Sequence, residues 1–159
     1  MAAVVATETT EIACVMIPVG DTHLLLPNVS VAEIVPWRRL KALDRADATP
    51  WCLGLLGWRG ETVPVVRFEL LNGAGVPGSP VGRCIVVMNR ARSRKGRAFY
   101  AVAADGLPRL LRLNAEDLST KPVRLGPAEV AAVRVGTEPA IVPNLTFIED
   151  SIAALKVAG

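Results

Sequence analysis

The residues best suited to catalysis are few in this chain and lie far apart along it. His23 is the only histidine, and it sits in an apolar segment without a recognisable pattern of nucleophile and orienting carboxylate. Cys14, Cys52 and Cys84 are also widely separated, and no pair has the spacing of metal ligands. The sequence therefore predicts a protein with no catalytic centre, no bound metal and no cofactor.

A different chemistry, recognition by a fixed cation, is indicated within residues 49–66. Gly57 and Gly60 bracket Trp58 and Arg59, so a bulky ring and a guanidinium sit together on a bend. A guanidinium forks onto carboxylates and stacks on aromatic rings, which suits it to contact a partner. A solvated arginine on an ordinary turn is the alternative. The glycines do not form a phosphate-binding loop, because a strand follows them where such a loop needs a helix.

The local structure around this bend is predicted from the residues on either side. Pro50 suits the first position of a short helix that runs through the leucines of 53–56. The β-branched run 63–66 predicts a buried strand. Because Pro64 has no backbone donor, that strand is predicted to be an edge strand or to carry a bulge.

The run Arg90–Arg97 carries five cations in eight residues, which could contact a phosphate backbone. No aromatic residue lies between these cations, although proteins that bind single strands combine charge with stacking platforms. We therefore favour a solvated hairpin tip for this run and keep nucleic-acid binding as the alternative.

Length and composition limit the class of protein. The 159 residues suffice for one domain, or for two very small ones sharing a core, and a hydrophobic content of 51% argues against wholesale disorder. The net charge of +3 does not by itself imply a nucleic-acid partner. No run reaches the roughly 18 apolar residues of a membrane span, and three scattered cysteines fit a reducing compartment. We expect a cytoplasmic protein with a flexible N-terminal tail, residues 1–11.

Many short apolar runs separated by glycine turns predict an all-β fold. The runs are 12–19, 23–27, 63–66, 83–88, 98–104, 110–113, 130–135 and 140–143. The turn residues of 72–80 form the clearest break in the chain. A single domain is expected over 12–159, with approximate subdomains 12–72 and 80–148 and a C-terminal helix over 146–156. Thr146 and Glu149 are in capping-box register at the start of that helix.

Pro50, Gly54, Arg59, Gly60, Pro64 and Val65 together resemble the signature of the CheW-like domain, a chemotaxis coupling module. The segment 26–34 resembles the same family's apolar strand that leads into Val-x-Glu-Ile. One departure is Arg67, where the family often has an acidic residue. Asp105 is interpreted as a turn former. The resemblance implies two small five-stranded β-barrel subdomains that share a core, with short helices. It leaves open which strands cross between the barrels.

The resemblance also implies a function and a surface. Arg59, Trp58, Val31 and Glu33 match the family's receptor-facing surface, although Val31 as a core residue and Glu33 as a turn cap are the alternatives. The implied partners are the signalling tip of a methyl-accepting chemoreceptor and the regulatory domain of a CheA-type histidine kinase. No small-molecule substrate is expected, and membrane contact is expected only through receptors. The proline-rich composition, Trp37 and Trp58, and the Arg67 departure resemble the ChpC-type accessory group of type IV pilus systems.

Overall fold

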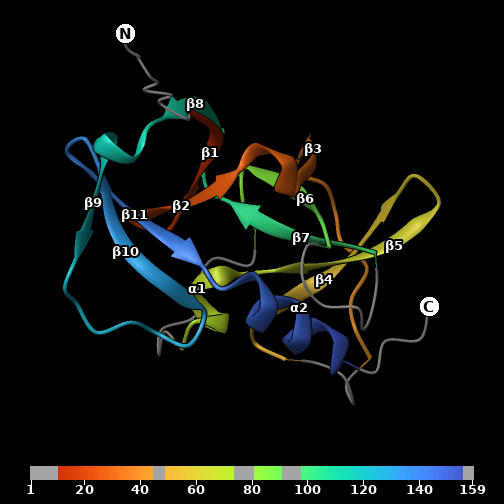
Figure 1. Cartoon of the computed structure of the whole chain (residues 1–159). Helices are drawn as coiled ribbons and strands as arrows, with labels where there is room; N and C mark the ends of the chain where they lie inside the picture. Colours follow the sequence, from red (N-terminus) through yellow and green to blue (C-terminus); the bar gives the residue numbers. More distant parts are fainter. Residues whose placement is uncertain (1–10, 45–48, 74–80, 91–97, 156–159) are drawn as a thin grey trace, which may run out of the picture.

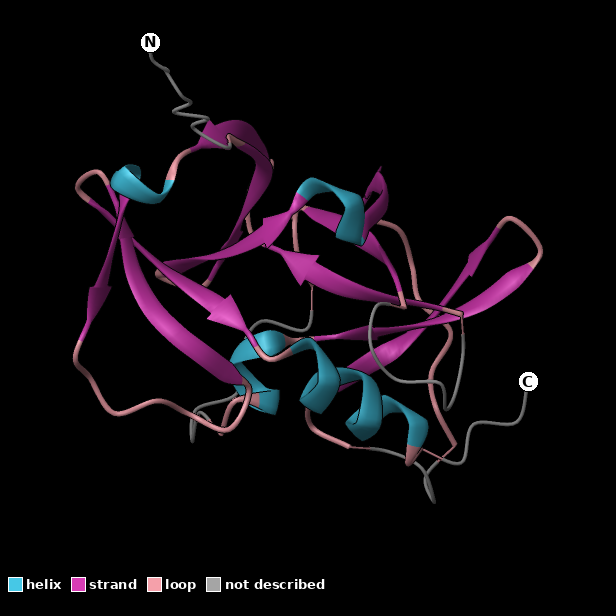
Figure 2. Cartoon of the chain, viewed as in Figure 1, coloured by secondary structure: helices cyan, strands magenta, loops and turns pink. Residues whose placement is uncertain are grey.

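The structure is a computed structural model, and it describes residues 11–44, 49–73, 81–90 and 98–155. Most of this part of the chain lies in strands that form two sheets side by side, with the C-terminal helix packed below them (Figures 1 and 2). The strands are β1 (Ile12–Val19), β2 (Thr22–Pro27), β3 (Val31–Pro36), β4 (Cys52–Trp58), β5 (Glu61–Val66), β6 (Cys84–Asn89), β7 (Phe99–Ala104), β8 (Arg109–Leu113), β9 (Leu118–Lys121), β10 (Glu129–Val135) and β11 (Glu138–Pro143). The helices are α1 (Phe68–Leu71), α2 (Leu145–Ala153) and the short 3-10 turns η1 (Asn28–Ser30) and η3 (Ala115–Asp117).

The two sheets have six and five strands, which confirms the all-β class. Their orders are β8-β1-β2-β11-β10-β9 and β3-β6-β7-β5-β4. Each sheet takes strands from both sides of the 72–80 break, so the predicted subdomains 12–72 and 80–148 do not correspond to the sheets. The chain instead leaves the six-stranded sheet after β2, builds the five-stranded sheet, and returns with β8.

Three apolar clusters fill the structure, and the alternation of side chains along the strands assigns residues to them. The shared core lies between the sheets. In β6, Val86 and Met88 face this core, whereas Ile85 and Val87 face a second cluster enclosed by the five-stranded sheet. β1 divides its side chains in the same way between the shared core and a third cluster, within the six-stranded sheet. Because both faces of these strands are buried, their sequences are continuous apolar runs.

The prediction of a helix at 50–56 was wrong, because these residues lead into and form β4. Gly54 lies within this strand at φ 149°, beside a β-bulge, and a Cβ there would lie 2.7 Å from the backbone oxygen of Lys41. The glycine therefore permits Lys41 to form a bridge with Leu55 on the outer edge of β4.

Pro64 was predicted to mark an edge strand or a bulge, but β5 is an interior strand and the bulge lies in β4. The proline is tolerated because pairing between β5 and β7 begins only at Val65, one residue later. At Pro64, which lacks the backbone donor, β5 is therefore paired with β4 but not with β7.

The start of α2 also differs from the prediction. Asn144, rather than Thr146, caps the helix, and its side-chain oxygen accepts a hydrogen bond from the backbone N–H of Phe147 at 3.0 Å. Glu149 is not part of a capping box, because with Asn144 as the cap the third helical position is Phe147; Glu149 is buried instead. Among the helices in the described residues, none has the length and hydropathy of a membrane span.

Glu149 accepts a hydrogen bond from the hydroxyl of Tyr100 at 3.3 Å, and this contact joins α2 to β7. Tyr100 is 2% exposed and Glu149 is 4% exposed. Burial raises the pKa of Tyr100 far above its ordinary value, and the charge and hydrogen bond of Glu149 raise it further. Ionisation of the phenol is therefore less favourable in the folded protein than in the unfolded chain.

This pair predicts a loss of stability at alkaline pH. A tyrosine in the unfolded chain ionises at about pH 10. The contribution of the raised pKa to the free energy of unfolding is therefore fully present below that pH and declines above it. Tyr100 is the only tyrosine, so its ionisation can be followed by tyrosinate absorbance alone. We expect the native protein to show no tyrosinate at about pH 10, and Tyr100→Phe to reduce the fall in the free energy of unfolding above it. Ionisation near about pH 10 in protein that is still folded would contradict this assignment.

Candidate functional site

The candidate site lies at the end of the β4–β5 hairpin, which extends away from the six-stranded sheet (Figure 1). Trp58 is the last residue of β4 and pairs with Glu61, the first residue of β5, so Arg59 and Gly60 form a two-residue turn. Both have positive φ, 47° for Arg59 and 77° for Gly60, as expected for a tight hairpin turn. Arg59 is the only non-glycine residue with positive φ in the described part of the chain.

Glu33 of β3 holds the side chains of this turn together. One of its carboxylate oxygens, Oε1, accepts a hydrogen bond from Nε1 of Trp58 at 2.9 Å and lies 3.0 Å from Nη2 of Arg59. The guanidinium carbon of Arg59 also lies 4.9 Å from the centroid of the Trp58 ring, a cation–π distance. The three side chains form one cluster, which we call the Glu33–Trp58–Arg59 cluster.

The members of this cluster differ in exposure. The side chain of Arg59 is 69% exposed and that of Glu33 is 38% exposed, so both face solvent. Trp58 is only 6% exposed and packs edge-on against Phe99, with ring centroids 4.9 Å apart. The indole, which the sequence analysis matched to the receptor-facing surface, is thus buried with its ring against the guanidinium of Arg59.

Val31 does not take part in the contacts that define the cluster. It begins β3, is half-buried, and packs against the shared core between the sheets. A bulge in the pairing of β3 with β6 lies between Val31 and Glu33. The structure thus places the two residues on the same strand, Val31 at the core and Glu33 at the cluster.

The cluster exists because the five-stranded sheet curls. β3 and β4 are the two outer strands of this sheet and have β6, β7 and β5 between them. The hydrogen bond from Trp58 to Glu33 nevertheless joins these two strands, across 25 residues of sequence. The outer strands of the sheet therefore approach each other through side chains, and this approach defines the site.

The candidate catalytic residues are not brought together. His23 lies in β2 opposite Pro18, and the three cysteines are separate, free and buried. Burial raises the pKa of Cys14, Cys52 and Cys84, which leaves their thiols less nucleophilic than an exposed cysteine. Within the described residues, no three His, Cys, Asp or Glu side chains are grouped as metal ligands.

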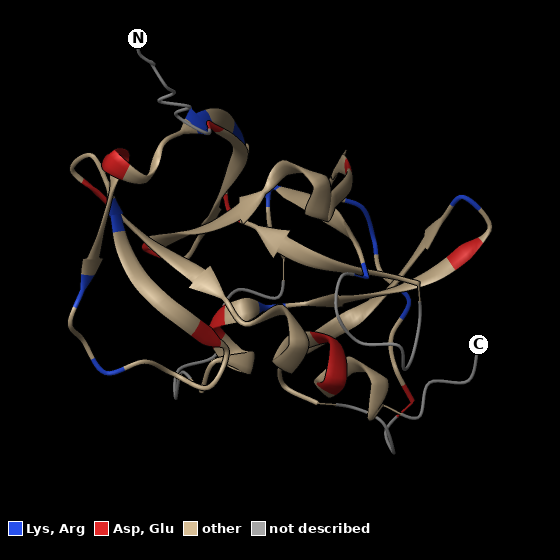
Figure 3. Cartoon of the chain, viewed as in Figure 1, with Lys and Arg blue, Asp and Glu red and all other residues tan. Residues whose placement is uncertain are grey.

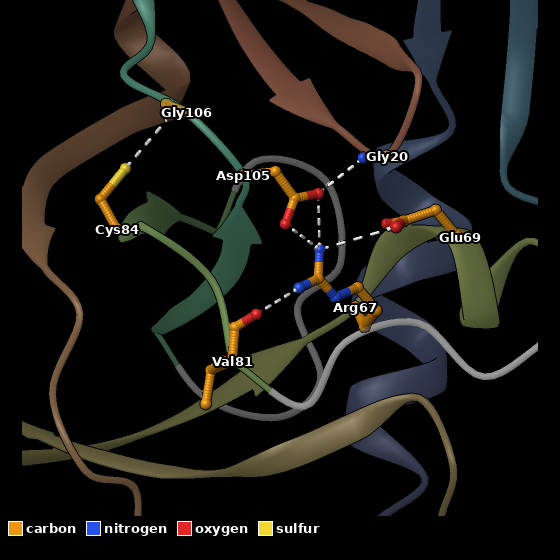
Figure 4. A network of polar contacts seen from close by, with 7 residues as sticks. All are labelled: Gly20, Arg67, Glu69, Val81, Cys84, Asp105 and Gly106. Atoms are coloured by element: carbon orange, nitrogen blue, oxygen red, sulfur yellow. Dashed lines mark hydrogen bonds and ion pairs between the residues drawn. The ribbon is translucent and has the colours of Figure 1, made fainter.

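A second polar network, which the sequence analysis missed, surrounds Arg67 (Figure 4). Arg67 follows β5 and is 1% exposed, and its Nη1 donates to both carboxylate oxygens of Asp105, at 2.9 and 2.8 Å. Asp105, predicted to be only a turn former, is thus the counter-ion of a buried cation. The signal that could have revealed the pair was Arg67 itself, a cation at the end of a buried strand.

The basic run is mostly outside the described residues, which end at Arg90 and resume at Ala98. The backbone N–H of Arg90 donates to the carbonyl of Ala98 at 2.9 Å. A basic and an acidic segment meet at the end of the β4–β5 hairpin (Figure 3).

Comparison with known proteins identifies the family. Residues 13–148 match the model of the CheW-like domain, so the chain belongs to that family. The fold is similar to the crystal structure of the scaffolding protein TtCheW from Thermoanaerobacter tengcongensis, with a TM-score of 0.69 and 14% identity. That match covers 94% of this chain and 100% of TtCheW. Among curated proteins, none matches the sequence.

Membership in this family defines the class of function. CheW-family scaffolds couple chemoreceptors and CheA, and this chain is a non-catalytic protein of the CheW-like scaffold family. The absence of a catalytic constellation in the sequence is consistent with this class. The resemblance inferred from the Arg59–Gly60 turn is confirmed over most of the chain.

The geometry of the turn predicts how Arg59 tolerates substitution. A left-handed backbone suits asparagine but penalises a β-branched residue by about 1–2 kcal/mol. We expect Arg59→Asn to change the free energy of unfolding by no more than about 0.5 kcal/mol. Arg59→Val should be less stable than Arg59→Asn by about 1–2 kcal/mol in urea denaturation. Equal stabilities for the two variants would show that the turn does not hold this conformation.

Proposed function

We propose that this protein couples a chemoreceptor to a CheA-type histidine kinase by binding both, and that the Glu33–Trp58–Arg59 cluster contacts the receptor. Membership of the CheW-like family supports the adaptor role. The receptor contact is the signalling tip of a methyl-accepting chemoreceptor, and the kinase contact is its regulatory domain. Binding, rather than chemistry on a substrate, is the mechanism.

The observation that carries the proposal is the fixed position of an exposed cation. Arg59 is held by the ion pair with Glu33 and by the ring of Trp58 beneath it. An exposed ion pair adds at most about 1 kcal/mol to stability, so this arrangement is poorly explained as a device for folding. A side chain that is already ordered loses less entropy on binding, which favours recognition of an acidic or polar partner surface.

The cellular setting is a finer part of the proposal. We place the protein in the cytoplasm, in a type IV pilus chemosensory system that controls twitching motility, within the ChpC-type group. The support comes from departures of the sequence from the family pattern: its 12 prolines, Trp37 and Trp58, and Arg67 where an acid is common.

Nucleic-acid binding through Arg90–Arg97 remains as the alternative function, and the family assignment gives it no support. The two functions are separated by their salt dependence. Binding through phosphate contacts weakens steeply as salt rises. We expect no measurable oligonucleotide binding at physiological salt, whereas the adaptor should co-elute with a kinase regulatory domain.

Charge reversal at Arg59 tests the receptor contact. Arg59→Glu places two carboxylates at the cluster and should repel an acidic partner, so we expect weaker binding to a receptor-tip fragment. The expected loss is about 1–3 kcal/mol, which corresponds to a rise in Kd of roughly fivefold to 150-fold. Binding to the kinase regulatory domain should persist. Both affinities are measured by titration, with thermal melting to check the fold.

A matched control is available in the same protein. Arg109 also forms an exposed ion pair, 2.6 Å from Glu138, with side chains that are 53% and 44% exposed. Arg109→Glu should leave receptor binding unchanged. If Arg59→Glu is folded and binds the receptor fragment like the wild type, Arg59 is not in the interface. Equal losses for both variants would indicate a general charge effect.

A further inference from the structure

The guanidinium of Arg67 links four segments of the chain (Figure 4). Nη1 donates to Asp105, which directly follows β7, and lies 3.6 Å from Oε2 of Glu69 in α1. Nη2 donates at 2.9 Å to the carbonyl of Val81, ahead of β6. Arg67 itself follows β5, so one side chain connects the ends of β5 and β7 with the start of β6 and with α1.

The network also reaches the other sheet through Asp105. Its Oδ2 accepts a hydrogen bond from the backbone N–H of Gly20 at 2.6 Å, and its own N–H donates to the carbonyl of Pro18. Gly20 lies in the turn between β1 and β2, in the six-stranded sheet. A Cβ on Gly20 would lie 3.2 Å from Oε2 of Glu69, so the turn packs closely against the same network. The charged groups therefore lie where the two sheets meet.

The location of Arg67 relates this network to the β4–β5 hairpin. The backbone N–H of Arg67 donates to the carbonyl of Trp51 at 2.8 Å, which closes the base of the hairpin. Arg59 lies at the opposite end of the same hairpin. Arg67 thus fastens the base of the hairpin to the turn between β1 and β2.

We propose that Arg67 is a positioning residue, which fixes the orientation of the five-stranded sheet and its hairpin relative to the six-stranded sheet. The apolar core between the sheets supplies attraction but little directionality. Hydrogen bonds and ion pairs with defined geometry select one orientation among those that the core permits. The proposal does not depend on the proposed function, because it concerns the protein without a partner.

The test measures distances between spin labels by double electron–electron resonance. One label pair, at Glu61→Cys and Ser119→Cys, spans the two sheets, and a second pair, at Leu110→Cys and Ser119→Cys, lies within the six-stranded sheet. All three positions are exposed, whereas the native cysteines are buried. In the wild-type background, we expect narrow distance distributions for both pairs.

Arg67→Met should broaden only the distribution between the sheets, because the shared core keeps the variant folded. Arg109→Met, which breaks an exposed ion pair within the six-stranded sheet, should broaden neither. A narrow between-sheet distribution in folded Arg67→Met would overturn the proposal, and so would equal broadening of both pairs. If Arg67→Met does not fold, Asp105→Asn is measured with the same two label pairs, and the same outcomes support or overturn the proposal. Asparagine is chosen because its side-chain oxygen can still accept the hydrogen bond from the backbone N–H of Gly20.

A second measurement tests whether Asp105 and Glu69 are held at the junction. Arg67→Asp introduces the acidic type of residue that the family often has at this position, but here it would bring three carboxylates together. We expect its melting temperature to lie below that of Arg67→Met, which adds no charge. If Arg67→Asp melts at the same temperature as Arg67→Met, or above it, the two carboxylates are not held by Arg67 and the proposal fails.

Discussion

Burial of apolar surface between the two sheets is the constraint on which this structure depends. The shared core takes side chains from β1, β2, β6 and β7 and from both α-helices, and these include Ile17, Val86, Phe68 and Ile148. Neither sheet could bury that face alone, so the two sheets are halves of one folding unit. The path of the chain reinforces this dependence, because four of the six strands of that sheet, β8 to β11, follow the five-stranded sheet in the sequence.

Two pairs of polar groups lie at the edge of this apolar interface, and each pair favours one relative placement of the segments that it joins. Arg67 meets Asp105 where the ends of β5 and β7 approach the turn between β1 and β2. Tyr100 meets Glu149 where α2 covers the core. A buried polar group without a partner costs free energy, so each pair disfavours arrangements in which its members are apart. Apolar contact alone would discriminate less strongly among slightly different orientations of the two sheets and α2.

The candidate site is more exposed to solvent than these two buried pairs. The side chain of Arg59 lies largely in solvent and that of Glu33 is partly exposed. The buried indole of Trp58 holds Glu33 by a hydrogen bond and Arg59 by its ring face. The candidate site is therefore an exposed cation held by a carboxylate and by a buried aromatic ring. Its support comes from the curl of the five-stranded sheet, because the outer strands β3 and β4 supply opposite sides of the cluster.

The sequence by itself determined the features that depend on neighbouring residues. It identified the all-β class, most strands, the turn at Arg59–Gly60 and the family. It mistook the start of β4 for a helix, since a short apolar run after Pro50 fits either element. The short and polar β9 gave no signal at all. Only the tertiary structure decided the strand order, the burial of Trp58 and the contacts from Glu33 to Trp58 and from Arg67 to Asp105. The members of these contacts are 25 and 38 residues apart, and the path of the sheets, which no local pattern encodes, brings them together.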